Sequence, residues 1–482
     1  MSVRFELAAI ATALLAILIP SDVLGAGLPH SDIETTHQLL SGASQFVSRH
    51  VRDESSTPSL ANVLGEMNMT ELMADDNTDK LEMVMDVFLG ANSGGLITQN
   101  RTITSYNETF DMCTISANQS CSMSYLRENQ SEGKQGWIVM PGNGTMCLDG
   151  SPFGFQVYPG NNQTEKSLFW FQGGGACYDY ETCIKLSTAL SSFSPESSGV
   201  FNYAEPSNPI GGNRWTTVVN NYCTGDAFMG TNKTQTFTDE PFSNKSAEVH
   251  FNGATNTLAV LDWFAAQPES KPSNKLAVGG CSAGSLGAQF WSKYLVENYN
   301  ASNFVLDSYI GDFSAPTGGD LNVMGVCDTG ANLMGWTPEY TAACANGSMH
   351  EMSDFFGPNL EAISPVPIAY VGSLNDIVQK SYYVITASND DSIITPFLRA
   401  LTEIQSTFTP YLLDTLGSYQ TIGSQFSYYL VDSDQHCFLP QANFYDAADI
   451  TANDAGNLTM LDFVNDFLNN DVYGSVSYPA RK

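Results

Sequence analysis

A serine stands in a short run of small residues that is typical of a nucleophile. Gly280-Cys281-Ser282-Ala283-Gly284 fits the pattern G-x-S-x-G. In this pattern the serine lies on a sharp turn from strand to helix, where bulky neighbours would clash. An apolar run, Lys275 to Val278, precedes it, and a helical pattern follows from about Ser285 to Tyr299. The context predicts Ser282 as the nucleophile. Cys281 is a rival, although the residue before an elbow serine normally points away from the site.

A serine nucleophile needs a base to take its proton, and one of the six histidines is well placed for this role. His436 follows a predicted strand in the C-terminal part of the chain. Hydrolases with G-x-S-x-G present their triad in the order serine, acid, histidine. The other histidines are His30, His37 and His50 in the N-terminal part, His250 in an apolar-flanked segment that favours a structural role, and His350 in a polar loop. The order predicts His436 as the base.

Two aspartates between the nucleophile and the base follow predicted strands. Asp312 comes after Phe304 to Ile310, and Asp376 comes after Ile368 to Val371. The acid usually follows the penultimate strand, which favours Asp376, and Asp312 stays an alternative. The carboxylate would hold the imidazole in one tautomer and stabilise the imidazolium without taking its proton.

Three glycines follow another predicted strand and suggest a site for an oxyanion. Ser167 to Phe171 is followed by Gln172-Gly173-Gly174-Gly175. Glycine lets a backbone approach a substrate oxygen, and lipases and esterases use such loops to donate backbone N–H groups. With the N–H of Ala283, the loop would bind the charged oxygen of a tetrahedral intermediate. A plain tight turn is the alternative interpretation.

Strands and helices alternate through the larger part of the chain, and this pattern predicts the fold class. The predicted strands are Trp137–Met140, Gly154–Tyr158, Ser167–Phe171, Thr216–Val219, Lys275–Val278, Phe304–Ile310, Ile368–Val371 and Ser427–Val431, and the predicted helices are Ala254–Ala266 and Ser285–Tyr299. Such alternation is typical of an α/β protein with a mostly parallel sheet and helices on both faces.

The N-terminal part differs from the rest. Residues 1–25 are predicted to be a signal peptide, because Arg4 is followed by an apolar run from Leu7 to Ile19 that Pro20 ends. Residues 26–134 form a polar N-terminal extension of unknown role, with one predicted helix near Asp79 to Leu89. Residues 135–475 then form the predicted catalytic domain.

Other features also indicate secretion to the extracellular space or the cell wall. The chain has twelve Asn-x-Ser/Thr sequons and ten cysteines, an even number that favours disulfides in an oxidising compartment. Proximity along the chain suggests the pairs Cys177–Cys183 and Cys327–Cys344. No later segment has the roughly 18 uninterrupted apolar residues of a membrane anchor.

Charge and missing motifs exclude several function classes. With 19 basic and 51 acidic residues, the net charge is −32. A nucleic-acid partner is not expected, since phosphate binding needs a surplus of Lys and Arg. Neither CxxC, H-E-x-x-H, a P-loop nor a dinucleotide-binding fingerprint is present, so no metal and no cofactor are expected.

Several ordered motifs resemble the pectin acetylesterase family, which includes plant cell-wall deacetylases, animal Notum and microbial proteins. The matching stretches are Gly144–Pro152, Gln172–Cys177 with Cys183, Asn221–Asp226, Gly279–Gly284, Asn375–Gln379 and His436-Cys437. The resemblance covers roughly residues 136–470. It implies an α/β-hydrolase-like fold and a triad of Ser282, Asp376 and His436. It also implies an oxyanion hole made by the backbone N–H groups of Gly175, Ala176 and Ala283.

One position departs from the plant and animal members of that family. They carry a tryptophan directly after the three glycines, whereas Ala176 stands here, as in the microbial variants. A backbone donor remains, but the wall of the acyl pocket loses a large ring.

These observations lead us to expect a secreted serine carboxylesterase that works through an acyl-enzyme. By resemblance, its substrate would be an acetyl ester on a polysaccharide such as pectin. The alternatives are an esterase for longer acyl groups or polyesters, a non-catalytic glycan-binding protein, and a structural cell-wall glycoprotein. The oligomeric state is not predicted.

Overall fold

The computed structural model describes residues 109–470, except 143, 162–164, 178–179, 181–182, 184–194, 212–214, 239–245, 272–273, 311–321, 323, 347–358, 360, 377, 380–407, 422–424 and 446–458. The predicted signal peptide and the predicted helix near residues 79–89 therefore lie outside the described residues. Within the described part, no helix is long and apolar enough to cross a membrane.

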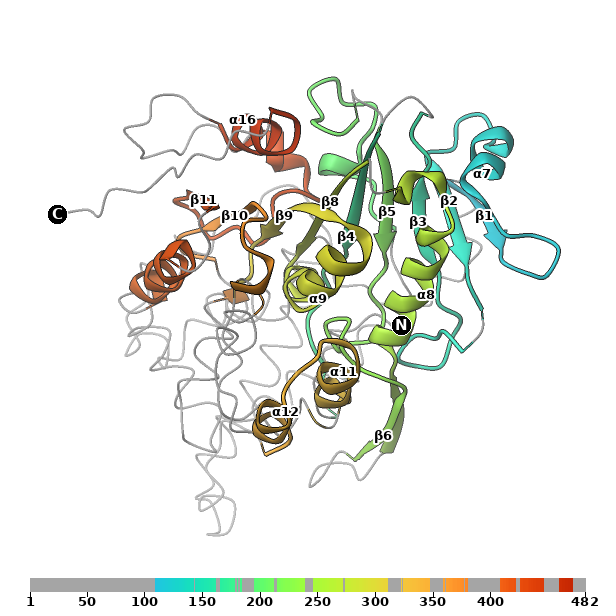
Figure 1. Ribbon diagram of the computed structural model, residues 1–482. Coiled ribbons are helices and arrows are strands. Elements are labelled where there is room, and N and C mark those ends of the chain that lie inside the picture. Colours follow the sequence, from blue (N-terminus) through green and yellow to red (C-terminus); the bar gives the residue numbers. More distant parts are fainter. Residues whose placement is uncertain are drawn as a thin grey trace, which may run out of the picture. The chain divides into compact units, whose positions relative to one another are not determined.

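A nine-stranded sheet is the centre of the domain, with the strand order β1-β2-β3-β5-β4-β8-β9-β10-β11 (Figure 1). Its strands are β1 (Phe110–Thr114), β2 (Gly136–Met140), β3 (Phe155–Tyr158), β4 (Lys166–Phe171), β5 (Thr216–Asn220), β8 (Lys275–Cys281), β9 (Ala301–Asp307), β10 (Ile368–Ser373) and β11 (Phe426–Val431). Only β3 runs antiparallel to its two neighbours. The prediction of a mostly parallel, α/β-hydrolase-like sheet is confirmed.

Every strand of this sheet except the edge strand β1 is largely buried on both faces, as parallel strands require. Alternate side chains of β4 enter two separate apolar cores: Phe169 and Phe171 enter one, and Leu168 and Trp170 enter the other. Successive side chains of a strand point to opposite faces, so the two cores lie on the two sides of the sheet.

Helices cover both cores. The first core takes apolar side chains from α8 (Gly253–Ala265), α9 (Ala283–Tyr299) and the helix at 408–421. The second core takes Met460, Phe463 and Val464 from α16 (Met460–Asn465). The prediction of helices on both faces is therefore confirmed, and α8 and α9 are seen together on one face (Figure 1).

The sheet begins earlier in the chain than predicted. Strand β1 pairs in parallel with β2, and Met123 and Leu126 of helix α7 (Met123–Asn129) belong to the first core. Both elements fall within residues 26–134, which we assigned to the extension from their polar composition. Strand β1 and helix α7 are therefore parts of the sheet domain.

Strand β9 differs from its prediction by three residues. The expected range was Phe304–Ile310, but the strand runs from Ala301 to Asp307. The apolar residues Tyr309 and Ile310 are buried in the loop that follows. Burial of the loop therefore extended the apolar signal beyond the strand.

Some elements had no prediction. Strands β6 (Lys233–Thr238) and β7 (Ser246–Phe251) form an antiparallel pair outside the main sheet. Helices α11 (Val326–Leu333) and α12 (Pro338–Ala345) are joined by the disulfide Cys327–Cys344. The hairpin alternates half-buried and exposed side chains along β6, so it has little apolar signal.

All ten cysteines are paired. The disulfides are Cys113–Cys121, Cys147–Cys223, Cys177–Cys183, Cys281–Cys437 and Cys327–Cys344. Both pairs proposed from proximity are confirmed. Of the other three, Cys147–Cys223 and Cys281–Cys437 join segments that only the fold brings together, and Cys113–Cys121 closes a short turn.

The disulfides should differ in their contribution to stability. Cys147–Cys223 spans 76 residues and Cys177–Cys183 spans 6. A longer loop loses more conformational entropy when it is closed in the unfolded chain, so replacing the first pair by alanines should cost about 4 kcal/mol and replacing the second about 2 kcal/mol. Urea unfolding of the two double variants measures this difference. Equal losses would contradict the loop-entropy explanation.

Candidate active site

Ser282 occupies a strained turn between a strand and a helix. Strand β8 ends at Cys281 and α9 begins at Ala283. Ser282 itself has φ 56° and ψ −124°, a backbone conformation that is uncommon for a residue with a side chain. Its N–H donates to the carbonyl oxygen of Asp307, 3.0 Å away on the neighbouring strand. The geometry is that of a nucleophile elbow.

The turn requires glycine on both sides of the serine. A Cβ at Gly280 would lie 2.1 Å from the carbonyl oxygen of Gly284, and a Cβ at Gly284 would lie 1.9 Å from the carbonyl oxygen of Phe171. Phe171 is the last residue of β4, directly before the glycine loop. The small residues therefore let α9 pack against the strand that carries this loop.

Asp376 and His436 are brought together from the ends of two adjacent strands. Asp376 follows β10 and is fully buried, and His436 follows β11. The His436 Nδ1 lies 3.0 Å from Oδ1 and 2.9 Å from Oδ2 of Asp376. The Asp376 carboxylate also accepts hydrogen bonds from the backbone N–H groups of Val378 and Gln379 and from the Gln379 side chain, each at 3.0 Å. These donors fix the carboxylate against the imidazole.

The environment of His436 favours its protonated form. Burial alone would lower the pKa of its imidazole, but the charge and hydrogen bond of Asp376 and the charge of Asp307 outweigh burial. The pKa of His436 is therefore raised above its usual 6.5. An imidazole of this kind is a stronger base than one in water.

The imidazole lies beside the elbow. A ring nitrogen of His436 is within 4.8 Å of the sulfur atoms of Cys281 and Cys437, the residues next to Ser282 and His436 in the chain. Among the described residues, the buried Nε2 of His436 has no hydrogen-bond partner. Ser282 and His436 are thus close, but no hydrogen bond joins them here. In enzymes without substrate such bonds are often long and shorten when substrate binds.

The glycine loop packs directly on Ser282. A Cβ at Gly173 would lie 2.9 Å from the carbonyl oxygen of Cys281 and 3.4 Å from the Ser282 Cβ. Gly175 has φ +77°, which glycine adopts without strain. The loop therefore approaches Ser282 in a way that side chains would prevent.

Two side chains that had no predicted role, those of Tyr222 and Gln172, hold this loop. The Tyr222 hydroxyl donates to the carbonyl oxygen of Gly175 at 2.7 Å, and its ring fills the space beside Gly174. The Gln172 side chain accepts from the Tyr222 N–H at 3.0 Å and donates to Glu196 at 3.1 Å. Burial raises the pKa of Glu196 to about 7, although the hydrogen bond from Gln172 acts against the shift.

Three other residues were considered in the sequence analysis, and each has its own outcome. Cys281 forms a disulfide with Cys437, so it has no thiol and the alternative of Cys281 as the nucleophile is excluded. The same disulfide removes both sulfurs as thiolate ligands for a metal ion beside His436. His250 lies on β7, where its Nδ1 is 3.1 Å from the Thr234 hydroxyl oxygen, which fits the structural role expected for it. Asp312 lies outside the described residues.

The comparisons with known proteins agree with the motifs. A family model described as pectinacetylesterase matches residues 115–313, which include the glycine loop and Ser282. This part of the chain is therefore similar to the pectin acetylesterase family. Asp376 and His436 lie beyond the matched residues, so their assignment depends on the geometry described above.

Two curated relatives of the same family come from Arabidopsis thaliana. Pectin acetylesterase 11 is 28% identical over 152 residues, and pectin acetylesterase 4 is 30% identical over 158 residues. The matches cover 30% and 31% of this chain and 36% of each relative, so the chain spans about a third of the length of the relatives it matches.

Among solved structures, two crystal forms of the Wnt deacylase Notum from Drosophila were matched. Their TM-scores are 0.45 and 0.46, with 17% sequence identity. The matches cover 68% and 69% of this chain, and 91% and 92% of the Notum chains.

The turn at Ser282 should not tolerate a methyl group at Gly284. Gly284→Ala would place a Cβ against the backbone of Phe171, so we expect a stability loss of about 1–3 kcal/mol and a displaced glycine loop. Gly417→Ala is the matched control, since nothing lies within 4 Å of a Cβ there and its helical position favours alanine. Thermal unfolding measures both. A Gly284→Ala protein as stable as Gly417→Ala would contradict the packing argument.

Proposed function

We propose that this protein is a serine carboxylesterase with Ser282 as nucleophile, His436 as base and Asp376 as the acid that orients it. The observation that carries the proposal is the Asp376–His436 hydrogen-bonded pair beside a strained elbow that presents Ser282. All three follow the carboxyl ends of parallel strands, the edge where open α/β sheets bind their ligands.

In the first half-reaction, Nε2 of His436 takes the proton of the Ser282 hydroxyl as its oxygen attacks the ester carbonyl carbon. The carbonyl oxygen becomes negatively charged in the tetrahedral intermediate and accepts hydrogen bonds from backbone N–H groups. Gly175, Ala176 and Ala283 are the proposed donors. His436 then gives its proton to the leaving alcohol, the ester C–O bond breaks, and an acyl-enzyme remains.

In the second half-reaction, water replaces the alcohol. His436 takes a proton from water as the water oxygen attacks the acyl carbon. The second tetrahedral intermediate collapses, the proton returns to Ser282, and the carboxylic acid leaves. Throughout, Asp376 holds Nδ1 protonated and stabilises the imidazolium. No metal or organic cofactor is needed for these steps.

We further propose that the substrate is an acetyl ester on a polysaccharide, because the curated relatives are named pectin acetylesterases. Secretion belongs to the same proposal. Five disulfides are expected of a protein from an oxidising compartment. The predicted signal peptide at residues 1–25 supports this location.

The first test is hydrolysis of p-nitrophenyl esters of increasing acyl length by the parent protein and Ser282→Ala. We expect acetate to be the best substrate, and we expect the variant to lose about 10³-fold or more of kcat/KM because no other group forms the acyl-enzyme. Ser427→Ala is the control, since its buried hydroxyl has no partner among the described residues and lies at the far end of β11.

Each result of this test decides between alternatives. A preference for longer chains would move the substrate to lipid-like or polyester acyl groups. Undiminished activity in Ser282→Ala would overturn the serine mechanism. An inactive parent would favour a glycan-binding protein.

The pH dependence should report the environment of His436. Only neutral imidazole accepts a proton, and the raised pKa means that kcat/KM falls to half at a pH above 6.5 and continues to fall in more acidic solution. Asp376→Asn removes the nearest negative charge, so the half-point should move to lower pH while the rate drops by about 10³- to 10⁴-fold. A half-point that stays in place would contradict the role of Asp376.

A further inference from the structure

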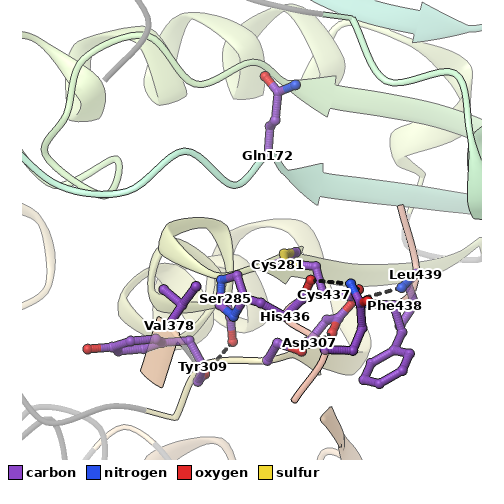
Figure 2. Close-up of a disulfide and its surroundings, with 12 residues drawn as sticks. Gln172, Cys281, Ser285, Asp307, Tyr309, Val378, His436, Cys437, Phe438 and Leu439 are labelled. Carbon is purple, nitrogen blue, oxygen red and sulfur yellow. Dashed lines mark hydrogen bonds between the residues drawn. A yellow bond between two sulfur atoms is a disulfide. The ribbon is translucent and has the colours of Figure 1, made fainter. Parts of the chain in front are cut away.

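Asp307 is a second buried carboxylate near the proposed triad, and its hydrogen bonds connect it to the loop that carries His436, the proposed base. It ends strand β9, between the strands that lead to Ser282 and Asp376, and its side chain is fully buried. One carboxylate oxygen, Oδ2, accepts the backbone N–H groups of Phe438 at 2.9 Å and Leu439 at 2.7 Å (Figure 2). These residues are the second and third after His436. The side chain therefore anchors the chain on which the imidazole is carried.

The backbone of the same residue holds the nucleophile. The carbonyl oxygen of Asp307 accepts the N–H of Ser282 at 3.0 Å. The Cys281–Cys437 disulfide joins the elbow to the loop that carries His436, as Figure 2 shows. Asp307 thus contacts the elbow through its main chain and the histidine loop through its side chain.

Asp307 does not replace Asp376 as the acid. The described hydrogen bonds of its carboxylate come from Phe438, Leu439 and the Ser308 hydroxyl, the last at 2.7 Å. The Nδ1 of His436 is bonded to Asp376 instead. Asp307 can therefore affect the reaction only indirectly, by positioning other groups or by the effect of its own charge on them.

We propose that Asp307 is a positioning residue of the esterase site, which sets the base against the nucleophile by binding the chain after His436 and the amide of Ser282. This inference rests on the proposed function. A shift of about 1 Å in the base would be enough to reduce the rate by roughly 100-fold.

The negative charge of Asp307 should have a measurable effect on the pKa of His436. Burial raises the pKa of Asp307 to about 6, while hydrogen bonds from Ser308, Leu439 and Phe438 and the charge of His436 act against the shift. Among the residues that the structure describes, the titratable groups that interact with it are His436 and Tyr370. At neutral pH the carboxylate is ionised and helps to raise the pKa of His436. Removing the charge should lower that pKa.

Two substitutions separate the hydrogen bonds from the charge. In Asp307→Asn the amide oxygen can still accept both N–H groups, and its NH₂ group can donate to the Ser308 hydroxyl, so the loop stays in place and only the charge is lost. Asp307→Ala loses the hydrogen bonds as well as the charge, and it leaves the two buried backbone N–H groups unpaired. We expect kcat to fall roughly 10- to 100-fold in Asp307→Ala with little change in KM. In Asp307→Asn most of kcat should return, and the acidic half-point of kcat/KM should move to lower pH.

Asp226 provides the matched control. It is also buried, has a pKa raised to about 6 by burial, and accepts backbone N–H groups from Gly253 and Phe228. It is not among the groups that shift the pKa of His436. Asp226→Asn should therefore leave the half-point unchanged, while any loss of stability from altering a buried carboxylate is common to both variants.

The measurements are pH profiles of kcat and KM on the best p-nitrophenyl ester, made on proteins shown to be folded by circular dichroism. Unchanged kcat in folded Asp307→Ala would overturn the inference. If Asp307→Ala does not fold, a half-point that is unmoved in Asp307→Asn, or that moves equally in Asp226→Asn, would overturn it. An inactive parent, or Ser282→Ala with full activity, would instead refute the proposed function.

Discussion

The site depends on one steric constraint, the close approach of α9 to the end of β4 around Ser282. The serine keeps a positive φ between strand and helix, and the carbonyl oxygens of Gly284 and Phe171 leave no space for a Cβ at positions 280 and 284. Because Phe171 leads directly into the glycine loop, the same contact sets Ser282 against the proposed oxyanion donors. Relaxing this turn would move two parts of the site at once.

The parallel sheet supplies the other groups. Strands β8, β9, β10 and β11 are neighbours in that order (Figure 1). Their carboxyl ends lead to Ser282, Asp307, Asp376 and His436 in turn. Their partners give the two aspartates different roles. Asp376 accepts the imidazole N–H, whereas Asp307 accepts two backbone N–H groups and supports the chain behind the imidazole. Burial makes both arrangements rigid, since an unpaired carboxylate would be costly there.

Strands with strong apolar runs and the two long helices could be predicted, because burial on both faces leaves a continuous signal. The elements without a prediction had weaker or mixed signals. The hairpin β6–β7 is partly exposed, and β1 lies within a polar region whose composition suggested an extension. The apolar loop after Asp307 shifted the predicted end of β9. Because of that shift, Asp312 was the aspartate expected to follow the strand, whereas Asp307 is the residue that ends it.

The sequence alone determined the chemistry that is available: a serine among glycines, an aspartate and a histidine in the right order, and a glycine-rich loop after a strand. These features depend on residue types and their order, which can be read directly from the sequence. Only the tertiary structure decided that Asp376 meets His436, that Cys281 is bonded to Cys437, and that Asp307 reaches Phe438 and Leu439. Cys281 and Cys437 are 156 residues apart in the chain. Contacts at such separations follow from strand order and burial, which local sequence does not encode.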